Sequence, residues 1–221
     1  MRKKVLIADD HQLILDGLCK ILEADFEVLK PVLDGRALLR SVAALQPDVV
    51  LADISMPLLN GLDAAAEISE TYPKTKVIIL TMHADVALAA KAFDVGAAGY
   101  LLKNAAGTEL KTAIETVLRG DTYIPPSLAD KLLKTYRGSA KVMQPERAEL
   151  TRRQREVLQL IAEGKTAAEA AGILHLSPRT IEFHKYRIMD VLGLESNAEL
   201  IRYAIDIGLI HGDSADPAVA P

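Results

Sequence analysis

Hydrophobic and polar positions in residues 4–119 follow two alternating patterns. Five short apolar runs predict strands, at 4–8, 26–32, 48–53, 76–81 and 99–103. Between them and after the last lie stretches with helical apolar spacing, at 13–23, 35–45, 61–72, 84–96 and 108–120. Three of the strands are almost continuously apolar, which is typical of strands buried on both faces. The alternation predicts an α/β unit with a parallel sheet covered by helices on both faces.

From residue 121 the pattern changes. A Pro pair, a short helical run and a polar stretch predict a connector that is partly helical. Thr151, Thr166 and Ser196 each precede a Glu or Gln by three residues, which is the capping-box spacing, and Ser177 precedes a Pro. These signals predict a small all-α domain of four helices. We therefore expect a first domain at 1–120, a linker at 121–147, a helical domain at 148–211 and a disordered tail at 212–221.

Composition and charge limit the possible functions. The chain has 221 residues and a formal charge of −4, and it carries one cysteine, which cannot form an internal disulfide. Its N-terminus lacks the apolar run of a signal peptide, and no segment approaches the length of a membrane span. We therefore expect a cytoplasmic protein without a membrane partner. Residues 150–221 hold 8 basic and 10 acidic residues, so any DNA binding depends on the local placement of charge.

Acidic and polar residues gather at the predicted carboxyl ends of the strands. Asp9 and Asp10 follow the first strand, Asp53 ends the third, and Thr81 and Lys103 end the fourth and fifth. A strand order of 2-1-3-4-5 would bring all five into one crevice, where such sheets bind their ligands. Three carboxylates this close repel one another unless a cation intervenes. Their oxygen atoms suit Mg²⁺, and Lys103 adds a fixed positive charge.

This pattern resembles the receiver domain of two-component response regulators over residues 4–119. The matching motifs are "ADD" at 8–10, "DISMPLLNG" at 53–61, Thr81, and "GYLLK" ending at Lys103. The resemblance implies a flavodoxin-like (βα)5 fold in which Asp53 accepts a phosphoryl group from a sensor histidine kinase. It also implies that Thr81 and Lys103 contact the phosphoryl group and that Tyr100 moves with it as a switch. The implied ligands of Mg²⁺, or Mn²⁺, are Asp9, Asp10, Asp53 and the backbone carbonyl group of Ser55.

Alternatives to a phosphoacceptor remain at this point. Taken singly, Asp9 and Asp10 could cap the next helix, and Lys103 could be a solvated charge. A rival enzymatic interpretation makes Asp53 the nucleophile of a small-molecule phosphatase, as in haloacid-dehalogenase-like proteins. That pattern requires a second Asp two residues later, where this sequence has Ser55. No glycine-rich phosphate loop follows the first strand either, so the sequence favours a signalling protein over a metabolic enzyme.

Residues 150–204 resemble the LuxR-type helix-turn-helix of NarL/FixJ-type regulators. The resemblance implies that residues 166–174 form the scaffold helix and that 177–192 form the recognition helix in the major groove of promoter DNA. The matching positions include Leu150, Thr151, Arg153, Glu156, Val157, Leu158, Gly164, Glu169, Leu174, Ser177, Thr180, His184, Ile188, Leu192 and Gly193.

The expected recognition helix has an unusual outward face. Helical spacing places Ile181 and Ile188 on its apolar side and turns Phe183 and Tyr186 the other way. The resemblance gives this face a use, because base edges and phosphates lie there. An open alternative is that the two aromatic residues pack on a partner protein or on the receiver. The implied DNA contacts are Thr166, Arg179, Thr180, Glu182, Phe183, His184, Lys185, Tyr186 and Arg187.

Two functional hypotheses emerge. In the first, phosphorylation of Asp53 activates a DNA-binding transcription regulator through homodimerisation or domain release. In the second, the helical domain is a protein-interaction module, because Ala167 and Ala168 replace an Asn-Lys pair common in the family and the domain is acidic overall. A DNA affinity that falls steeply with salt favours the first hypothesis, since phosphate contacts release counterions.

Overall fold

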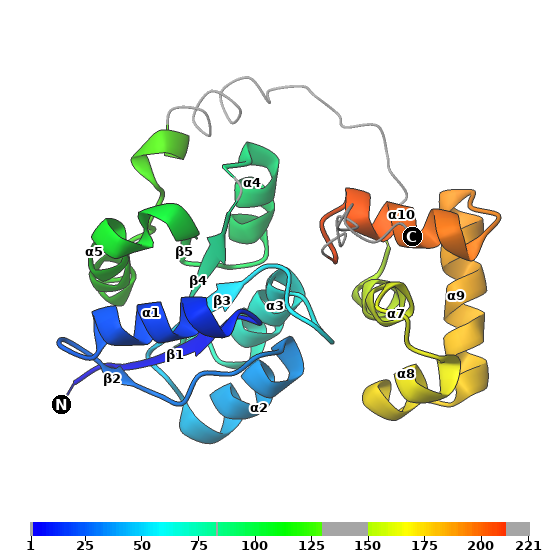
Figure 1. The fold of residues 1–221 in the computed structure, drawn as a ribbon, viewed down its shortest axis with the longest axis horizontal. Helices are drawn as coiled ribbons and strands as arrows, with labels where there is room; N and C mark the ends of the chain where they lie inside the picture. Colours follow the sequence, from blue (N-terminus) through cyan, green and yellow to red (C-terminus); the bar gives the residue numbers. More distant parts are fainter. Residues whose placement is uncertain (1, 83, 130–149, 211–221) are drawn as a thin grey trace, which may run out of the picture. The chain divides into compact units, whose positions relative to one another are not determined.

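The chain forms two compact units, Met1–Glu146 and Arg147–Pro221 (Figure 1). The structure is a computed structural model that describes residues 2–82, 84–129 and 150–210. Most of the predicted linker and the predicted tail lie outside the described residues. In the part that is described, no helix is both long and apolar enough to cross a membrane.

The first unit is built around a five-stranded sheet with the order β2-β1-β3-β4-β5. Every neighbouring pair is parallel, which confirms the predicted topology. All five residues of β3 are buried, as expected for a central strand covered on both faces. The strands are β1 (Lys4–Ala8), β2 (Glu27–Val28), β3 (Val49–Asp53), β4 (Lys76–Thr81) and β5 (Gly99–Leu102).

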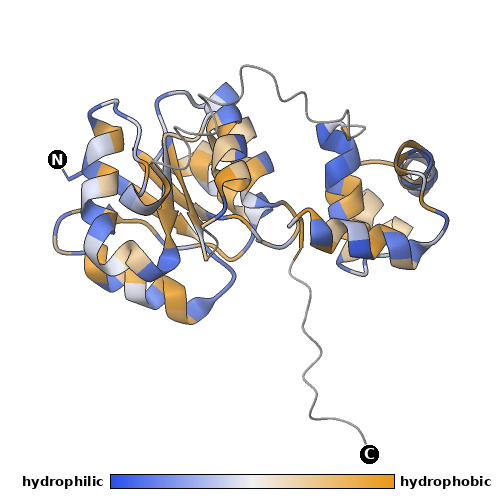
Figure 2. Ribbon diagram, turned by 90° about the horizontal axis from the view of Figure 1, so that it is seen from above, coloured by the Kyte–Doolittle hydropathy of each residue, from blue (hydrophilic) through white to orange (hydrophobic). Residues whose placement is uncertain are grey.

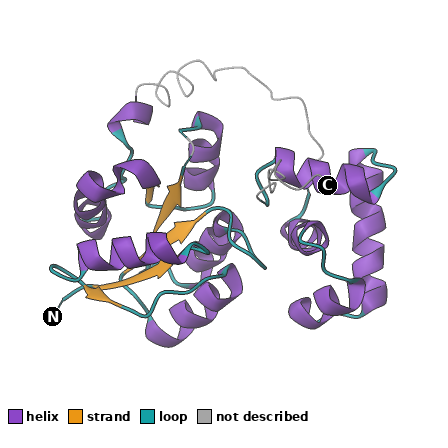
Figure 3. Ribbon diagram, viewed as in Figure 1, coloured by secondary structure: helices purple, strands orange, loops and turns teal. Residues whose placement is uncertain are grey.

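Helices cover both faces of this sheet (Figure 3). One apolar core joins the strands to α1 and α5, and a second joins them to α2, α3 and α4. Figure 2 shows predominantly apolar strands between helices that carry both hydrophilic and hydrophobic residues. The helices are α1 (Gln12–Leu22), α2 (Gly35–Leu45), α3 (Gly61–Thr71), α4 (Val86–Asp94) and α5 (Ala106–Leu118), with a 3-10 turn, η1, at Lys103–Ala105.

The second strand is shorter than its hydrophobic run suggests. The run predicted a strand over 26–32, but β2 covers two residues, and an isolated bridge joins Val32 to Ala8. The amide groups of Glu27 and Leu29 bond to the carbonyl groups of Lys3, just before β1, and of Val5 within it. The next donor in that series would be Pro31, which has no N–H group. Val32 donates to the carbonyl group of Ile7 instead, so the ladder is displaced by one residue.

The second unit contains four helices in its described part, each beginning where a cap was predicted. Thr151 and Thr166 form complete capping boxes, and Ser177 accepts a hydrogen bond from the Thr180 amide with Pro178 at the first helical position. At Ser196 the expected box is only half made, because the Glu199 carboxylate accepts from the amide of Glu195 instead. The helices are α7 (Arg152–Ala162), α8 (Ala167–Leu174), α9 (Pro178–Leu192) and α10 (Asn197–Asp206).

A tight turn joins α8 to α9. His175 ends α8 in the left-handed conformation, with φ of 54°, and Ser177 already caps the next helix. Arg153 of α7 braces this turn, since its guanidinium group bonds both to the Glu156 carboxylate and to the carbonyl group of Leu174, each at 2.7 Å. Two bonds from one guanidinium group fix its plane. The brace holds the end of α8, and with it the start of α9, against α7.

Candidate acidic site and nucleic-acid interface

The predicted polar residues meet at the carboxyl end of the sheet. Asp9 follows β1, Asp53 ends β3, Thr81 ends β4 and Lys103 follows β5. Asp9, Asp53 and Thr81 are buried, although each carries a polar side chain. Parallel strands place their carboxyl ends along one edge, so neighbours in the sheet become neighbours in the site.

Lys103 links two of the carboxylates. Its ammonium nitrogen lies 2.7 Å from Asp9 Oδ2 and 2.9 Å from Asp53 Oδ1, and its side chain is only 7% exposed. Opposite charges attract each other more strongly where water is excluded than on the surface. The lysine therefore anchors the two acidic groups and partly neutralises them.

The ionisation of the site reflects this burial. Desolvation raises the pKa of the Asp53 carboxyl group above its ordinary value, the positive charge of Lys103 opposes that rise, and the charges of Asp9 and Asp10 add to it. For Lys103, burial alone would lower the pKa, but the nearby carboxylates outweigh burial and raise it. Lys103 thus stays protonated, and any further positive charge brought to the site would stabilise the ionised form of Asp53.

In the described part of the chain, one oxygen atom of the cluster lacks a partner that could balance its charge. Asp53 Oδ2 is buried and has no hydrogen-bond partner among the residues that the structure describes. A buried carboxylate oxygen without a partner is costly, because it has lost its water and gained nothing in return. An all-oxygen set at this place fits a hard divalent cation such as Mg²⁺.

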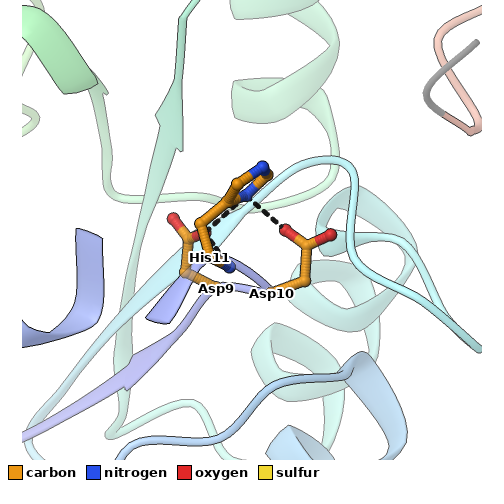
Figure 4. Close-up of side chains that lie close together, drawn as sticks. All are labelled: Asp9, Asp10 and His11. Atoms are coloured by element: carbon orange, nitrogen blue, oxygen red, sulfur yellow. Dashed lines mark hydrogen bonds and ion pairs between the residues drawn. The ribbon is translucent and has the colours of Figure 1, made fainter. Parts of the chain in front are cut away.

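His11 is a member of the cluster that the sequence did not single out. Its Nδ1 atom lies 2.7 Å from Asp10 Oδ1 and 3.2 Å from Asp9 Oδ1, and Figure 4 shows the ring against both carboxylates. One possible ligand atom from each of the three residues lies within 4.8 Å of the others. The adjacency to Asp10 was visible in the sequence, but the direction of the ring was not. Ser55 lies in the loop after β3, and the metal-binding role of its carbonyl group stays a prediction.

The loop after β3 is held closely against Asp53. Gly61, the first residue of α3, donates its amide hydrogen to the carbonyl group of Ile54. A Cβ atom at Gly61 would lie 2.0 Å from the Asp53 carbonyl oxygen. Only glycine allows this approach, so the end of β3 and the start of α3 are fixed together. The sequence motif contained Gly61, but the steric reason becomes visible only in the structure.

Thr81 and Tyr100 form a connected pair on neighbouring strands. The Tyr100 side chain is completely buried and shares a side-chain hydrogen bond with Thr81. Burial raises the pKa of Tyr100 to about 12, and the bond to Thr81 opposes that rise. Tyr100 therefore lies inward in this structure, and its role as a switch stays a prediction.

The outward face of α9 is as polar and aromatic as predicted. Ile181 and Ile188 are completely buried, whereas Phe183 is 60% exposed and Tyr186 is 64% exposed. Large exposed aromatic residues are costly to leave in water and are typical of binding surfaces. The other predicted contacts divide by exposure: Thr166, Arg179 and Arg187 are exposed, and Thr180, Glu182, His184 and Lys185 are half-buried.

Charged and aromatic side chains beside one another on α9 also contact one another along the helix. Lys185 Nζ lies 3.9 Å from Glu182 Oε2 and 5.9 Å from the centre of the Tyr186 ring. Phe183 also makes an edge contact with His184, at 5.8 Å between ring centres. Lys185 is therefore partly withdrawn along α9, whereas Arg179 and Arg187 extend into water.

Two family models match the chain. Residues 5–115 match the response regulator receiver domain, and residues 148–204 match the bacterial regulatory proteins of the luxR family. A similar protein, the oxygen regulatory protein NreC of Staphylococcus carnosus, is 40% identical over 210 residues, which are 91% of this chain and 96% of that protein. NreC of Staphylococcus aureus is 39% identical over the same shares.

Solved structures of RcsB are also similar. One is RcsB from Salmonella enterica serovar Typhimurium bound to promoter rprA in the presence of the phosphomimetic BeF₃⁻, with 30% identity and a TM-score of 0.56 over 93% of this chain and 99% of that one. Another contains two RcsB dimers bound to two parallel DNAs, with 31% identity and a TM-score of 0.60 over 94% of this chain and all of that one.

Proposed function

We propose that phosphorylation controls the DNA binding of this chain. The chain belongs to the family of two-component response regulators that join a receiver domain to a LuxR-type DNA-binding domain. It is a DNA-binding response regulator and not a metabolic enzyme. In our proposal, Asp53 receives a phosphoryl group from a sensor histidine kinase. The observation that carries the proposal is the buried Asp53 carboxylate, anchored at Oδ1 by Lys103 and without a partner at Oδ2.

The transfer itself requires little from the protein beyond position and charge. A bond forms between an Asp53 oxygen and phosphorus as the bond from phosphorus to the kinase histidine nitrogen breaks, and the imidazole leaves. Lys103 stays close enough to offset negative charge on the transferred group. Thr81, which ends the neighbouring strand, would donate a hydrogen bond to the same group.

The acidic residues would hold a divalent cation, Mg²⁺ or Mn²⁺. Its ligands would be the carboxylates of Asp9, Asp10 and Asp53 and the backbone carbonyl group of Ser55, with Asp9 acting directly or through water. A bound cation supplies positive charge that stabilises the phosphoryl oxygens. The orphaned oxygen of Asp53 and the all-oxygen ligand set support this assignment.

Phosphorylation would then shift a two-state equilibrium of the receiver. Thr81 turns to the phosphoryl group, and Tyr100, already hydrogen-bonded to Thr81, is held inward. That change alters the surface made by α4, β5 and α5 and favours a homodimer, so that two α9 helices read two half-sites. RcsB dimers on DNA support the dimeric form. We further propose that the protein acts in the cytoplasm.

DNA contacts divide into two roles. Phe183, Tyr186 and Glu182 would approach base edges, because they lie on the face of α9 opposite its buried isoleucines. Arg179 and Arg187 are exposed and would bind phosphates or guanines. Thr166, Thr180, His184 and Lys185 would position the DNA backbone beside them.

The decisive experiment is a comparison of wild type with Asp53→Asn. Wild type should bind promoter fragments more tightly with Mg²⁺ and beryllofluoride than without, whereas Asp53→Asn should ignore the phosphoryl mimic. Thr71→Val, which changes an exposed residue at the far end of α3, is a matched control and should respond like wild type. An undiminished response of Asp53→Asn would refute phosphorylation at this residue.

A second experiment concerns the role of Phe183. Selection of bound fragments from genomic DNA gives the preferred sequence of wild type and of Phe183→Ala. A changed preference is expected if the ring contacts bases, whereas a uniform loss of affinity across sequences would assign it to the DNA backbone. The selected fragments should also bind with an affinity that falls steeply with salt, because each phosphate contact releases counterions.

A further inference from the structure

The first residues after α5 form an additional edge of the receiver sheet. We name residues 121–129 the strap. Tyr123 pairs with Gly99 of β5 in a parallel bridge: its amide group donates to the Ala98 carbonyl group, and its own carbonyl group accepts from the Tyr100 amide, both at 3.0 Å. The strap therefore satisfies backbone groups at the outer edge of β5, which would otherwise be an open edge.

Strap side chains enter both apolar cores, as expected when successive residues of an extended chain point to opposite faces. Tyr123 is 9% exposed and belongs to the core under α1 and α5. Its hydroxyl group donates to Glu109 Oε2 of α5 at 2.7 Å. Ile124 packs against the opposite core, and Leu128 is completely buried there. The strap is thus fastened to α5 on one side of the sheet and to the core beneath α4 on the other.

Tyr100 is the point at which the strap meets the phosphorylation site. Its backbone amide bonds to the strap, its side chain lies in the same apolar core as Leu128, and its side chain is hydrogen-bonded to Thr81 at the end of β4. Cores are closely packed, so a ring that leaves one side of a core removes contacts from residues on the other. An outward movement of Tyr100 would therefore weaken the support of Leu128.

We infer that docking of the strap and the inward position of Tyr100 stabilise each other, so that occupation of Asp53 tightens the strap at the start of the interdomain linker. This inference rests on the proposed roles of Asp53, Thr81 and Tyr100. Coupling between two sites is reciprocal. A phosphoryl mimic at Asp53 must therefore tighten the strap, and loosening the strap must weaken binding of the mimic by the same factor.

Hydrogen exchange of the full chain measures the first half of this coupling. With Mg²⁺ and beryllofluoride, the hydrogen-bonded amides of the strap, at Tyr123, Leu128 and Ala129, should exchange about fivefold more slowly, the lower end of typical coupling between sites. The Tyr100 amide, which bonds to the strap, should slow by the same factor. Protection of the crevice loops with unchanged exchange in the strap would overturn the coupling and leave the proposed function intact. A wild-type chain whose crevice also ignores beryllofluoride would overturn both.

Substitution in the strap measures the second half. Leu128→Ala should bind beryllofluoride about fivefold more weakly than wild type, as measured by ¹⁹F NMR titration in Mg²⁺. Leu22→Ala is the matched control, because Leu22 is equally apolar, is 1% exposed and lies in the opposite core at the end of α1. An equal loss in both variants would mean general destabilisation and would overturn the coupling, as would no loss in Leu128→Ala.

Two milder variants keep the test decisive if Leu128→Ala does not fold. Leu128→Val removes less volume and should weaken beryllofluoride binding in the same direction by a smaller factor. Tyr123→Phe removes the hydroxyl bond to Glu109 but keeps the backbone pairing with β5 and the buried ring, so it should loosen the strap less than Leu128→Val does. Its affinity should therefore fall by no more than about twofold. Unchanged affinity in Leu128→Val, together with unchanged strap exchange, would overturn the coupling.

Discussion

The receiver and the helix-turn-helix unit use charge in opposite ways. In the receiver, Asp9, Asp53 and Lys103 come from three different strand ends and have buried side chains, and each carboxylate has an oxygen within 3 Å of the lysine nitrogen. On α9, Arg179 and Arg187 come from one helix and are exposed to water. Water weakens interactions between charges, and burial strengthens them. The receiver site should therefore behave as one unit, whereas the α9 face should behave residue by residue.

The largest expected effect comes from removing the positive charge of Lys103 from the receiver site. Lys103→Met leaves two carboxylates buried without their partner, and breaking a buried pair in this way costs about 3 kcal/mol or more. Asp53→Asn in the same chain removes one of the stranded charges and should restore at least about 1 kcal/mol. The free energy of opening of the receiver, measured by hydrogen exchange of its β3 amides in metal-free buffer at pH 7, checks both values.

The same comparison of two single variants with their double variant, made on α9, provides the contrast. Arg179→Ala and Arg187→Ala should weaken DNA binding additively, within about 0.5 kcal/mol, because the two side chains share no partner among the residues that the structure describes. Additive behaviour of Lys103 and Asp53 would contradict the description of the receiver site as a unit. Strong coupling of the two arginines would contradict the description of α9.

Helix α9 depends on a local signal that the receiver site does not need. Ser177 accepts the Thr180 amide at 3.1 Å and so satisfies one of the donors left open at a helix start. Ser177→Ala should lower the stability of the second unit by about 1 kcal/mol, while Ser177→Gly should cost only a few tenths. Hydrogen exchange of the α9 amides in the full chain measures both. Equal losses in the two variants would show that the hydroxyl group does not cap the helix.

The same distinction explains what the sequence could predict. Helix starts were predictable because Ser, Thr and Pro act on the next three residues, and the five-strand topology followed from alternating periods. The meeting of Asp9, Asp53 and Lys103 was predictable because parallel strands bring their carboxyl ends together, whereas the part that His11 takes in the cluster was not. The direction of the His11 ring, the pairing of Tyr123 with β5 and the displaced ladder at Pro31 depend on packing between distant segments, which no local pattern records.

A smaller effect is expected for one phosphate contact on α9. Arg179→Ala should reduce the slope of log affinity against log salt by about one unit if Arg179 binds one phosphate. Asp190→Ala, which changes an exposed acidic residue of the same helix, is the control. It removes no positive charge, so it should leave the number of phosphate contacts, and with it the slope, unchanged. DNA titrations at several salt concentrations give both slopes, and an unchanged slope for Arg179→Ala would assign this side chain another role.

The smallest effect is expected for an ion pair that lies in the receiver but, unlike the Lys103 cluster, is partly open to water. Asp48 accepts from Lys3 Nζ at 2.7 Å and from the Lys4 amide at 2.9 Å, but this pair is partly exposed to water. Burial alone would raise the pKa of Asp48, and the bonds from Lys3 and Lys4 outweigh it and lower the pKa. A lowered pKa means that the stabilisation is present above the unfolded pKa of about 4 and is lost as the pH falls through the lower folded value.

Asp48→Asn should therefore lower the free energy of unfolding by about 0.5 kcal/mol at pH 7, by less in 1 M salt, and by progressively less below about pH 4. Urea unfolding of both chains across this range measures the difference, and a cost that grows as the pH falls would reverse the assigned sign.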